Sequence, residues 1–147
     1  MADLDIAAEI DIAADPTDVA AVMFDPAREP EWMKAVTGVE VIDPALAPGA
    51  RVRHTAQLLG RDVSWTSEVE AVHFPHVLAL RIAEGPFVGT VRYDVQRSAS
   101  GTRARVRNVG AASGFGFLPA ALIAGPMRSA LEADLQRLKD IVERERT

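Results

Sequence analysis

The chain has 147 residues, of which 48% are hydrophobic and 25% are charged, and its net charge is −5. These values fit one domain spanning residues 1–147 with a buried core, and the negative charge disfavours nucleic acid or an anionic membrane as a partner. The absence of cysteine excludes disulfides, thiolate nucleophiles and Cys-ligated metals.

The first predicted element is a strand at Leu4–Ile12, where Leu, Ile and Ala alternate mainly with acidic residues. The acidic start of the chain, Met1–Asp5, lacks the basic region of a signal peptide. No later stretch approaches the roughly 18 consecutive apolar residues of a membrane span. We therefore expect a cytoplasmic protein without stable membrane insertion.

Two short helices are predicted after this strand. Asp15-Pro16 supplies an N-cap and a proline at the first helical position, and this helix should end near Phe24. Asp25-Pro26 repeats the pattern before a second helical piece that ends near Trp32-Met33. The next predicted strand is Val39–Ile42.

Residues 51–59 and 62–72 predict a β-hairpin that turns at Gly60-Arg61. In this register His54 lies opposite Ser67, and both side chains face inward. The outward pairs are Arg51 with Glu70 and Arg53 with Glu68, so opposite charges meet on the solvent face.

Two further hairpins follow. A turn at Gly85-Pro86 sets Leu78 opposite Tyr93 and Leu80 opposite Val91. A turn at Ser100-Gly101 sets Tyr93 opposite Asn108, Val95 opposite Val106, and Asp94 opposite Arg107. The strands after Pro48 are therefore predicted to be consecutive and antiparallel, and a loop at residues 110–116 should follow them.

The last predicted element is a long amphipathic helix over residues 118–143. Its apolar side chains include Met127, Leu131, Leu135 and Leu138, spaced as on one face of a helix, and Leu131 and Leu135 should be among the most buried residues. Gly125-Pro126 predicts a kink or a broken first segment. The pattern indicates an α+β fold, in which an antiparallel sheet of about seven strands curves round the C-terminal helix.

Several short segments resemble one known family. They are the "P-x-x-V" of residues 16–19, Glu31-Trp32, the "G-x-R" of Gly49-Ala50-Arg51, Glu84–Phe87, Gly101–Arg103 and residues 135–143. Over nearly its whole length the chain resembles the START/Bet v 1-like (SRPBCC) superfamily, and more narrowly its polyketide cyclase/dehydrase branch. This resemblance implies a helix-grip fold with a pocket for polyketides, lipids, sterols or phenolics. Members share no universal catalytic set, so the fold does not fix an activity.

His54 and Tyr93 are the candidate proton-transfer groups, because both are predicted on inward strand faces. A neutral core histidine with one hydrogen bond is the alternative for His54. Tyr93 and Asn108 could likewise satisfy each other rather than a ligand.

The candidate ligand contacts are inward-facing polar residues together with large apolar ones. They are Trp32, His54, Trp65, Ser67, Phe87, Tyr93, Asn108, Phe115, Phe117, Leu118, Leu122 and Met127. For most of the large apolar side chains ordinary core packing is the alternative, whereas Phe115 and Phe117 on a glycine-rich loop suit a gate. Small residues at Ala120, Ala121 and Ala124 place the expected cavity under the first half of the helix.

Other patterns predict no metal site and no cofactor. His73 and His76 lack a third ligand, and residues 110–116 lack the strand, helix and Lys-Ser/Thr of a phosphate loop. Arg103, Arg105 and Arg107 are predicted to line one outward strand face. Their positive charge can be offset there by Asp94, Glu68 and Glu70. The sequence contains no Gly-x-Ser-x-Gly elbow, and no Ser/His/acid grouping stands out.

The sequence thus favours binding of a hydrophobic small molecule in an internal cavity, by a monomer or homodimer. A polyketide cyclase, aromatase or dehydratase that uses His54 or Tyr93 is the alternative from another class. A third, weaker possibility is protein interaction through an exposed sheet edge.

Overall fold

The computed structural model describes residues 2–58, 60–112 and 120–145. Within those ranges the order is one strand, short helices, six strands and one long helix. The helical elements are α1 (Pro16–Met23), the 3₁₀ turn η1 (Pro26–Arg28), α2 (Glu29–Trp32) and α3 (Ala120–Glu145). The strands are β1 (Ala2–Ile12), β2 (Val36–Val41), β3 (Arg51–Leu58), β4 (Arg61–His73), β5 (Val77–Ile82), β6 (Phe87–Ser98) and β7 (Gly101–Ala112).

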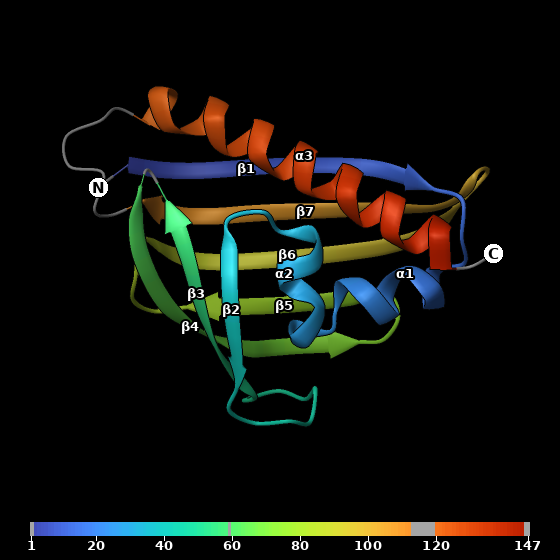
Figure 1. Ribbon diagram of the computed structural model, residues 1–147, viewed down its shortest axis with the longest axis horizontal. Coiled ribbons are helices and arrows are strands. Elements are labelled where there is room, and N and C mark those ends of the chain that lie inside the picture. Colours follow the sequence, from blue (N-terminus) through green and yellow to red (C-terminus); the bar gives the residue numbers. More distant parts are fainter. Residues whose placement is uncertain (1, 59, 113–119, 146–147) are drawn as a thin grey trace.

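The described strands form one antiparallel sheet in the order β1-β7-β6-β5-β4-β3-β2. Strands β2 to β7 pair in chain order, as the predicted meander requires, and β1 adds to the free side of β7. Helix α3 lies along β1 on one face of the sheet, and α2 lies between α3 and β2 (Figure 1). This is the predicted helix-grip architecture, with a curved sheet held against a long C-terminal helix.

The β3–β4 hairpin differs from the predicted register by two residues. β3 ends at Leu58 and β4 begins at Arg61, so His54 lies opposite Trp65 rather than Ser67. Alternate residues of a strand share a face, so a shift of two keeps every side chain on its predicted side. His54 and Ser67 therefore still face inward, as diagonal rather than direct neighbours.

The predicted outward pairs Arg51–Glu70 and Arg53–Glu68 are wrong as a result of this shift. Arg51 lies opposite Glu68, and its guanidinium binds Asp43 at 3.0 Å. Glu68 binds Arg81 of the neighbouring β5 at 3.2 Å.

The β6–β7 hairpin shows the same two-residue shift. Tyr93 lies opposite Val106 rather than Asn108, because Gly101 belongs to β7 and pairs with Ser98. The predicted pairs Val95–Val106 and Asp94–Arg107 are wrong for the same reason, whereas Leu78–Tyr93 and Leu80–Val91 between β5 and β6 are confirmed. β7 also continues to Ala112, into the predicted loop.

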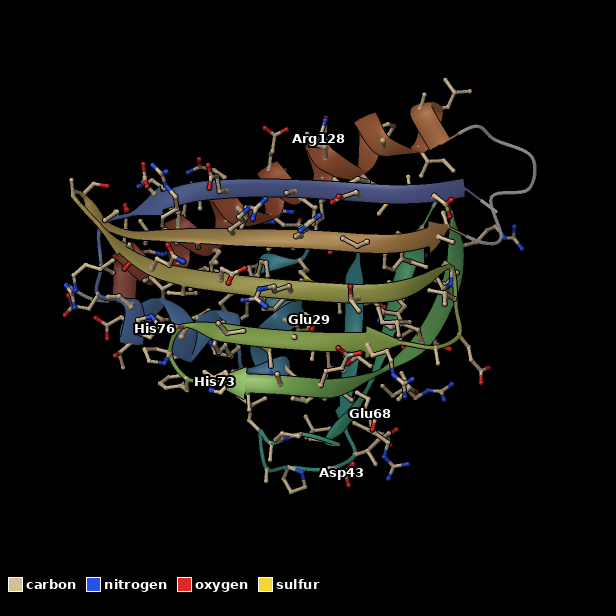
Figure 2. The ribbon with its side chains drawn as sticks, turned by 180° about the vertical axis from the view of Figure 1, so that it is seen from behind. Glu29, Asp43, Glu68, His73, His76 and Arg128 are labelled. Carbon is tan, nitrogen blue, oxygen red and sulfur yellow. The ribbon has the colours of Figure 1, made fainter. Side chains whose placement is uncertain are left out.

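The outer face of the sheet carries paired charges (Figure 2). Arg107 binds Asp5 at 2.6 Å and Arg103 binds Asp11 at 3.1 Å, both across the β1–β7 pair. The predicted ion-paired face is therefore present, but β1 supplies these partners. Asp94 instead binds Arg92 of its own strand.

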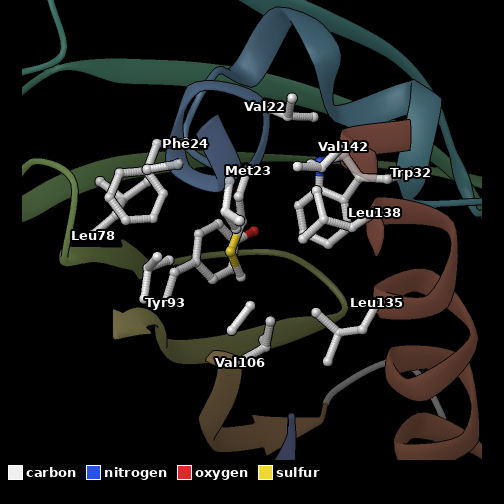
Figure 3. Packing of buried hydrophobic residues seen from close by; sticks show 14 of the residues in the cluster. Val22, Met23, Phe24, Trp32, Leu78, Tyr93, Val106, Leu135, Leu138 and Val142 are labelled. Carbon is white, nitrogen blue, oxygen red and sulfur yellow. The ribbon is translucent and has the colours of Figure 1, made fainter. Parts of the chain in front are cut away.

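Helix α3 is continuous from Ala120 to Glu145 with Pro126 inside it. Of the two alternatives predicted at Gly125-Pro126, the broken first segment is therefore wrong, and the kink stays a prediction. Figure 3 shows Leu135, Leu138 and Val142 pointing from α3 toward Trp32 and Tyr93. These side chains join the buried core, and Leu135 is 1% exposed as predicted. Leu131 is only partly buried, which contradicts the expected burial at that position.

Candidate functional site

A cavity of about 260 Å³ lies between the sheet, α2 and the middle of α3. Met127, Leu131 and Asp134 border it from the helix, so it does not lie under the first half as predicted. In that half Ile123 and Ala124 pack on Leu4 and Ile6. The full lining is Glu29, Met33, Ala35, Val36, His54, Leu58, Trp65, Ser67, Leu80, Ile82, Pro86, Phe87, Val91, Tyr93, Val106, Asn108, Ala112, Met127, Ala130, Leu131 and Asp134.

Three lining residues from separate elements form a hydrogen-bonded chain. Nδ1 of His54 lies 2.7 Å from Oε1 of Glu29, and Nε2 of His54 lies 2.8 Å from Oγ of Ser67. Glu29 is 7% exposed, His54 3% and Ser67 2%. Burial of these groups is tolerable only because each is hydrogen-bonded to the next.

Local structure explains how the chain brings these residues together. In β3, alternate positions are buried, which turns His54 inward, and Ser67 occupies a buried position of β4. Glu29 begins α2 and lies three residues before the buried Trp32, so both side chains occupy the face that meets the sheet. The Glu29–His54 contact joins residues 25 positions apart and ties α2 to β3.

The imidazole of His54 is also held from its face. Its ring stacks on the indole of Trp65, with centroids 5.2 Å apart and planes inclined by 11°. Trp65 lies directly opposite His54 in the sheet. The stack and the two hydrogen bonds leave the ring little freedom to rotate.

Tyr93 brings a phenol to the same cavity. Burial raises its pKa well above 10.0, and the charges of Glu29 and Asp134 raise it further. No hydrogen bond joins this hydroxyl to another described residue. The phenol therefore stays protonated and keeps its hydrogen-bond donor.

Two further polar residues border the cavity. Burial raises the pKa of Asp134, although its carboxylate accepts from the backbone N–H of Lys34 and from Arg137. Oδ1 of Asn108 is buried and has no partner among the described residues. The expected Tyr93–Asn108 pairing is absent from this part of the chain, since Asn108 lies opposite Val91.

Most predicted contact residues with a described position lie at the cavity. Those that line it are His54, Trp65, Ser67, Phe87, Tyr93, Asn108 and Met127. Trp32 instead lies in the core, 1% exposed, and Leu122 is 61% exposed on the opposite side of α3. Phe115, Phe117 and Leu118, including the predicted gate, lie outside the described residues.

Sequence reasoning missed Glu29 and Asp134, and with Glu29 it missed the Ser/His/acid grouping. Both acids carried a usable signal, because each shares a helical face with apolar residues. Glu29 is spaced three and four residues from Trp32 and Met33, and Asp134 lies three after Leu131. An acid on an apolar stripe needs a partner or a function.

The remaining expectations concern metals and membranes. Within residues 2–58, 60–112 and 120–145, no group of three or more His, Asp or Glu is arranged to hold a metal ion. Nδ1 of His76 bonds to the carbonyl of Val95 at 2.8 Å. None of the described helices is long and apolar enough to cross a membrane.

Known proteins resemble this chain in sequence and in fold. Residues 3–143 match the family described as polyketide cyclase / dehydrase and lipid transport. No curated protein matches the sequence.

Solved structures show the same fold at low sequence identity. A protein from Thermus thermophilus superposes with a TM-score of 0.81 and 23% identity, over 98% of this chain and 100% of that one. A START superfamily protein from Mycobacterium smegmatis gives a TM-score of 0.81 at 14% identity, over 95% and 97% of the chains. The di-domain ARO/CYC BexL from the BE-7585A biosynthetic pathway gives 0.73 at 20% identity, over 95% of this chain and 46% of BexL.

Proposed function

Because the chain belongs to the polyketide cyclase / dehydrase and lipid transport family, we propose that it binds an apolar small molecule in the cavity beneath α3. The observation that carries this proposal is the composition of the cavity wall. Apolar side chains such as Leu80, Val91 and Leu131 make up most of it, and a few polar groups converge on it. That combination is typical of small-molecule sites.

The size of the cavity narrows the class of ligand. Its volume of about 260 Å³ lies just below the roughly 300–1,000 Å³ of most ligand pockets. A compact aromatic or polycyclic molecule fits that space better than a long acyl chain. Glu29, Tyr93 and Asp134 could then orient its polar substituents.

Two measurements test this function. Native mass spectrometry of freshly purified protein should reveal a bound small molecule, released on denaturation. Titration with an apolar fluorescent probe should show saturable binding that a compact aromatic competitor reverses. Neither a co-purifying ligand nor saturable uptake would contradict the proposal.

A second candidate is a cyclase or dehydratase that uses the same cavity. The specific observation in its favour is the Glu29–His54–Ser67 chain, which fixes a histidine at the wall where it could move protons. Tyr93 could supply the complementary acid. Conversion of a poly-β-ketone analogue that is lost in His54→Gln would support this reaction.

A further inference from the structure

We propose that Ser67 is a nucleophile, and that the cavity transfers or hydrolyses acyl groups of compact, apolar esters. This inference rests on the proposed function, because the ester must enter the same cavity. It goes beyond that function in assigning a covalent step to one hydroxyl.

The first support is the arrangement around the hydroxyl. An activated nucleophile requires a base within about 2.6–3.2 Å and a third group that orients the base. Nε2 of His54 lies 2.8 Å from Oγ of Ser67, and Oε1 of Glu29 lies 2.7 Å from Nδ1. Both distances fall in that range, and all three residues border the cavity.

The second support is the direction of the hydrogen bonds. An ionised Glu29 carboxylate only accepts, so Nδ1 of a neutral His54 carries the hydrogen and donates it. Nε2 is then an acceptor, and the Ser67 hydroxyl donates to it. This tautomer lets His54 take the Ser67 proton while lone pairs of Oγ remain for attack on a carbonyl.

The third support is a donor for the charge that develops during attack. Tyr93 borders the same cavity, and its protonated hydroxyl has no hydrogen bond to another described residue. Tyrosine hydroxyls serve as oxyanion donors in other enzymes. We assign Tyr93 this role toward the carbonyl oxygen of a bound ester.

The reaction balances without any group beyond ester and water. Oγ of Ser67 bonds to the carbonyl carbon while its proton passes to Nε2 of His54. The bond between carbon and the leaving alkoxide then breaks, and the alkoxide takes that proton and departs as an alcohol. Water attacks the acyl-Ser67 ester with His54 again as base, and the acid leaves as Ser67 regains its proton.

The first experiment uses an alkyl fluorophosphonate, which labels activated serines, and short-chain p-nitrophenyl esters. Intact mass should show one adduct per chain, located at Ser67 by peptide mapping, and ester hydrolysis should exceed the buffer rate. Ser67→Ala should lose both, and His54→Gln should lower hydrolysis about 100-fold or more. Ser64→Ala is the matched control, because Ser64 is exposed on the same strand and, among the described residues, its hydroxyl bonds to Arg53.

The second experiment needs no ester and exploits the absence of cysteine from the chain. Ser67→Cys and Ser64→Cys each introduce a single thiol, and iodoacetamide alkylation is followed against pH. If His54 acts as a base, iodoacetamide should alkylate the Ser67→Cys thiol at pH values well below the ordinary thiol pKa of about 8.5. The Ser64→Cys thiol should follow the ordinary profile.

The outcomes separate this inference from the proposed function. The assignment of Ser67 as a nucleophile is overturned if no adduct forms at Ser67 and both thiol variants show ordinary pH profiles. The binding function stays intact if the protein still takes up an apolar probe saturably. Failure of probe uptake contradicts the binding function itself. If Ser67→Ala does not fold, the two thiol profiles alone decide the assignment.

Discussion

Glu29 and His54 form a buried contact of 2.7 Å between the first residue of α2 and the middle of β3. An acid and an imidazole that are 7% and 3% exposed have little access to water. Nδ1 of His54 and the Glu29 carboxylate therefore depend on each other for a hydrogen-bond partner. The same contact that orients the His54 ring also holds α2 against the sheet.

Glu29→Ala should destabilise the fold by about 1–3 kcal/mol, because Nδ1 of His54 would lose its acceptor in a buried place. Glu29→Gln should cost less, because its amide oxygen can still accept from Nδ1. Urea denaturation at pH 7 measures both. Equal losses in the two variants would show that the charge of Glu29, rather than its acceptor oxygen, maintains the contact with His54.

Leu135→Ala should cost about 2–5 kcal/mol, because Leu135 is 1% exposed at the centre of the α3 core contact. Leu122→Ala is the matched control on the same helix. Leu122 is 61% exposed, so its loss should fall within about 0.5 kcal/mol. Denaturant midpoints compare the two, and a cost below about 1 kcal/mol for Leu135→Ala would contradict the clasped helix.

The sequence predicted the faces of the strands better than their registers. Alternation assigned His54, Ser67 and Tyr93 to the interior, and the structure agrees. Both shifted hairpins moved by two residues, which alternation cannot detect because it repeats every two residues. The turns fix the register: the loops between β3 and β4 and between β6 and β7 each lie one residue earlier than the predicted turns, and Gly60 and Gly101 take positive φ values there.

The site residues on strands were predicted correctly, whereas the prediction of which α3 residues face the sheet was wrong at Leu122. Leu122 lies five residues before Met127, and at roughly 100° per residue this step turns about 140° away from the apolar stripe. Ile123, four residues before Met127, is the buried one. The partnership of Glu29 with His54 joins separate elements, so no local pattern specifies it.

Asp134→Asn should change the pH dependence of stability. Burial raises the pKa of Asp134 above 3.8, so the folded state holds this proton more tightly than the unfolded state. The contribution of Asp134 to stability is then fully present below 3.8 and falls as pH rises through the folded-state pKa. Urea denaturation across acid pH should therefore show that the free energy of unfolding of Asp134→Asn increases relative to that of the wild type as pH rises.

In Asp5→Asn the stability relative to the wild type should change with pH in the opposite direction. The hydrogen bond from Arg107 lowers the pKa of Asp5, so its contribution is present above 3.8 and is lost as pH falls through the lowered value. The free energy of unfolding of this variant should therefore decrease relative to that of the wild type as pH rises. The same direction of change in both variants would contradict the burial assigned to Asp134.

The charge of the cavity predicts which compact aromatic ligands bind. Its lining includes the acids Glu29 and Asp134, and the described lining residues include neither Lys nor Arg. 2-Naphthylmethylamine should therefore displace an apolar probe at a concentration at least about tenfold lower than 2-naphthoate, a difference of roughly 1.4 kcal/mol. Competition titrations at pH 7 measure the ratio.

Asp134→Asn should narrow that ratio, because it removes one of the two acids. Asp140→Asn is the matched control, since Asp140 is exposed on α3 and bonds to Gln136. Equal or tighter binding of 2-naphthoate to the wild type would show that the cavity does not favour cations.

Filling the cavity from the helix side should abolish binding and spare the fold. Leu131 is the residue for this test, because it lies at the middle of α3, borders the cavity and is only partly buried. In Leu131→Trp the larger ring can extend into the space that a ligand would occupy. We expect loss of saturable probe uptake, with overpacking limited to about 1–3 kcal/mol.

Leu122→Trp controls for the added indole, because it places the same ring on the exposed side of α3. This variant should bind the probe like the wild type. Thermal melting and probe titration of both variants separate the two effects. If Leu131→Trp fails to fold while Leu122→Trp melts normally, the space beside Leu131 is too small for the ring, and the wall is a packed core rather than a binding cavity.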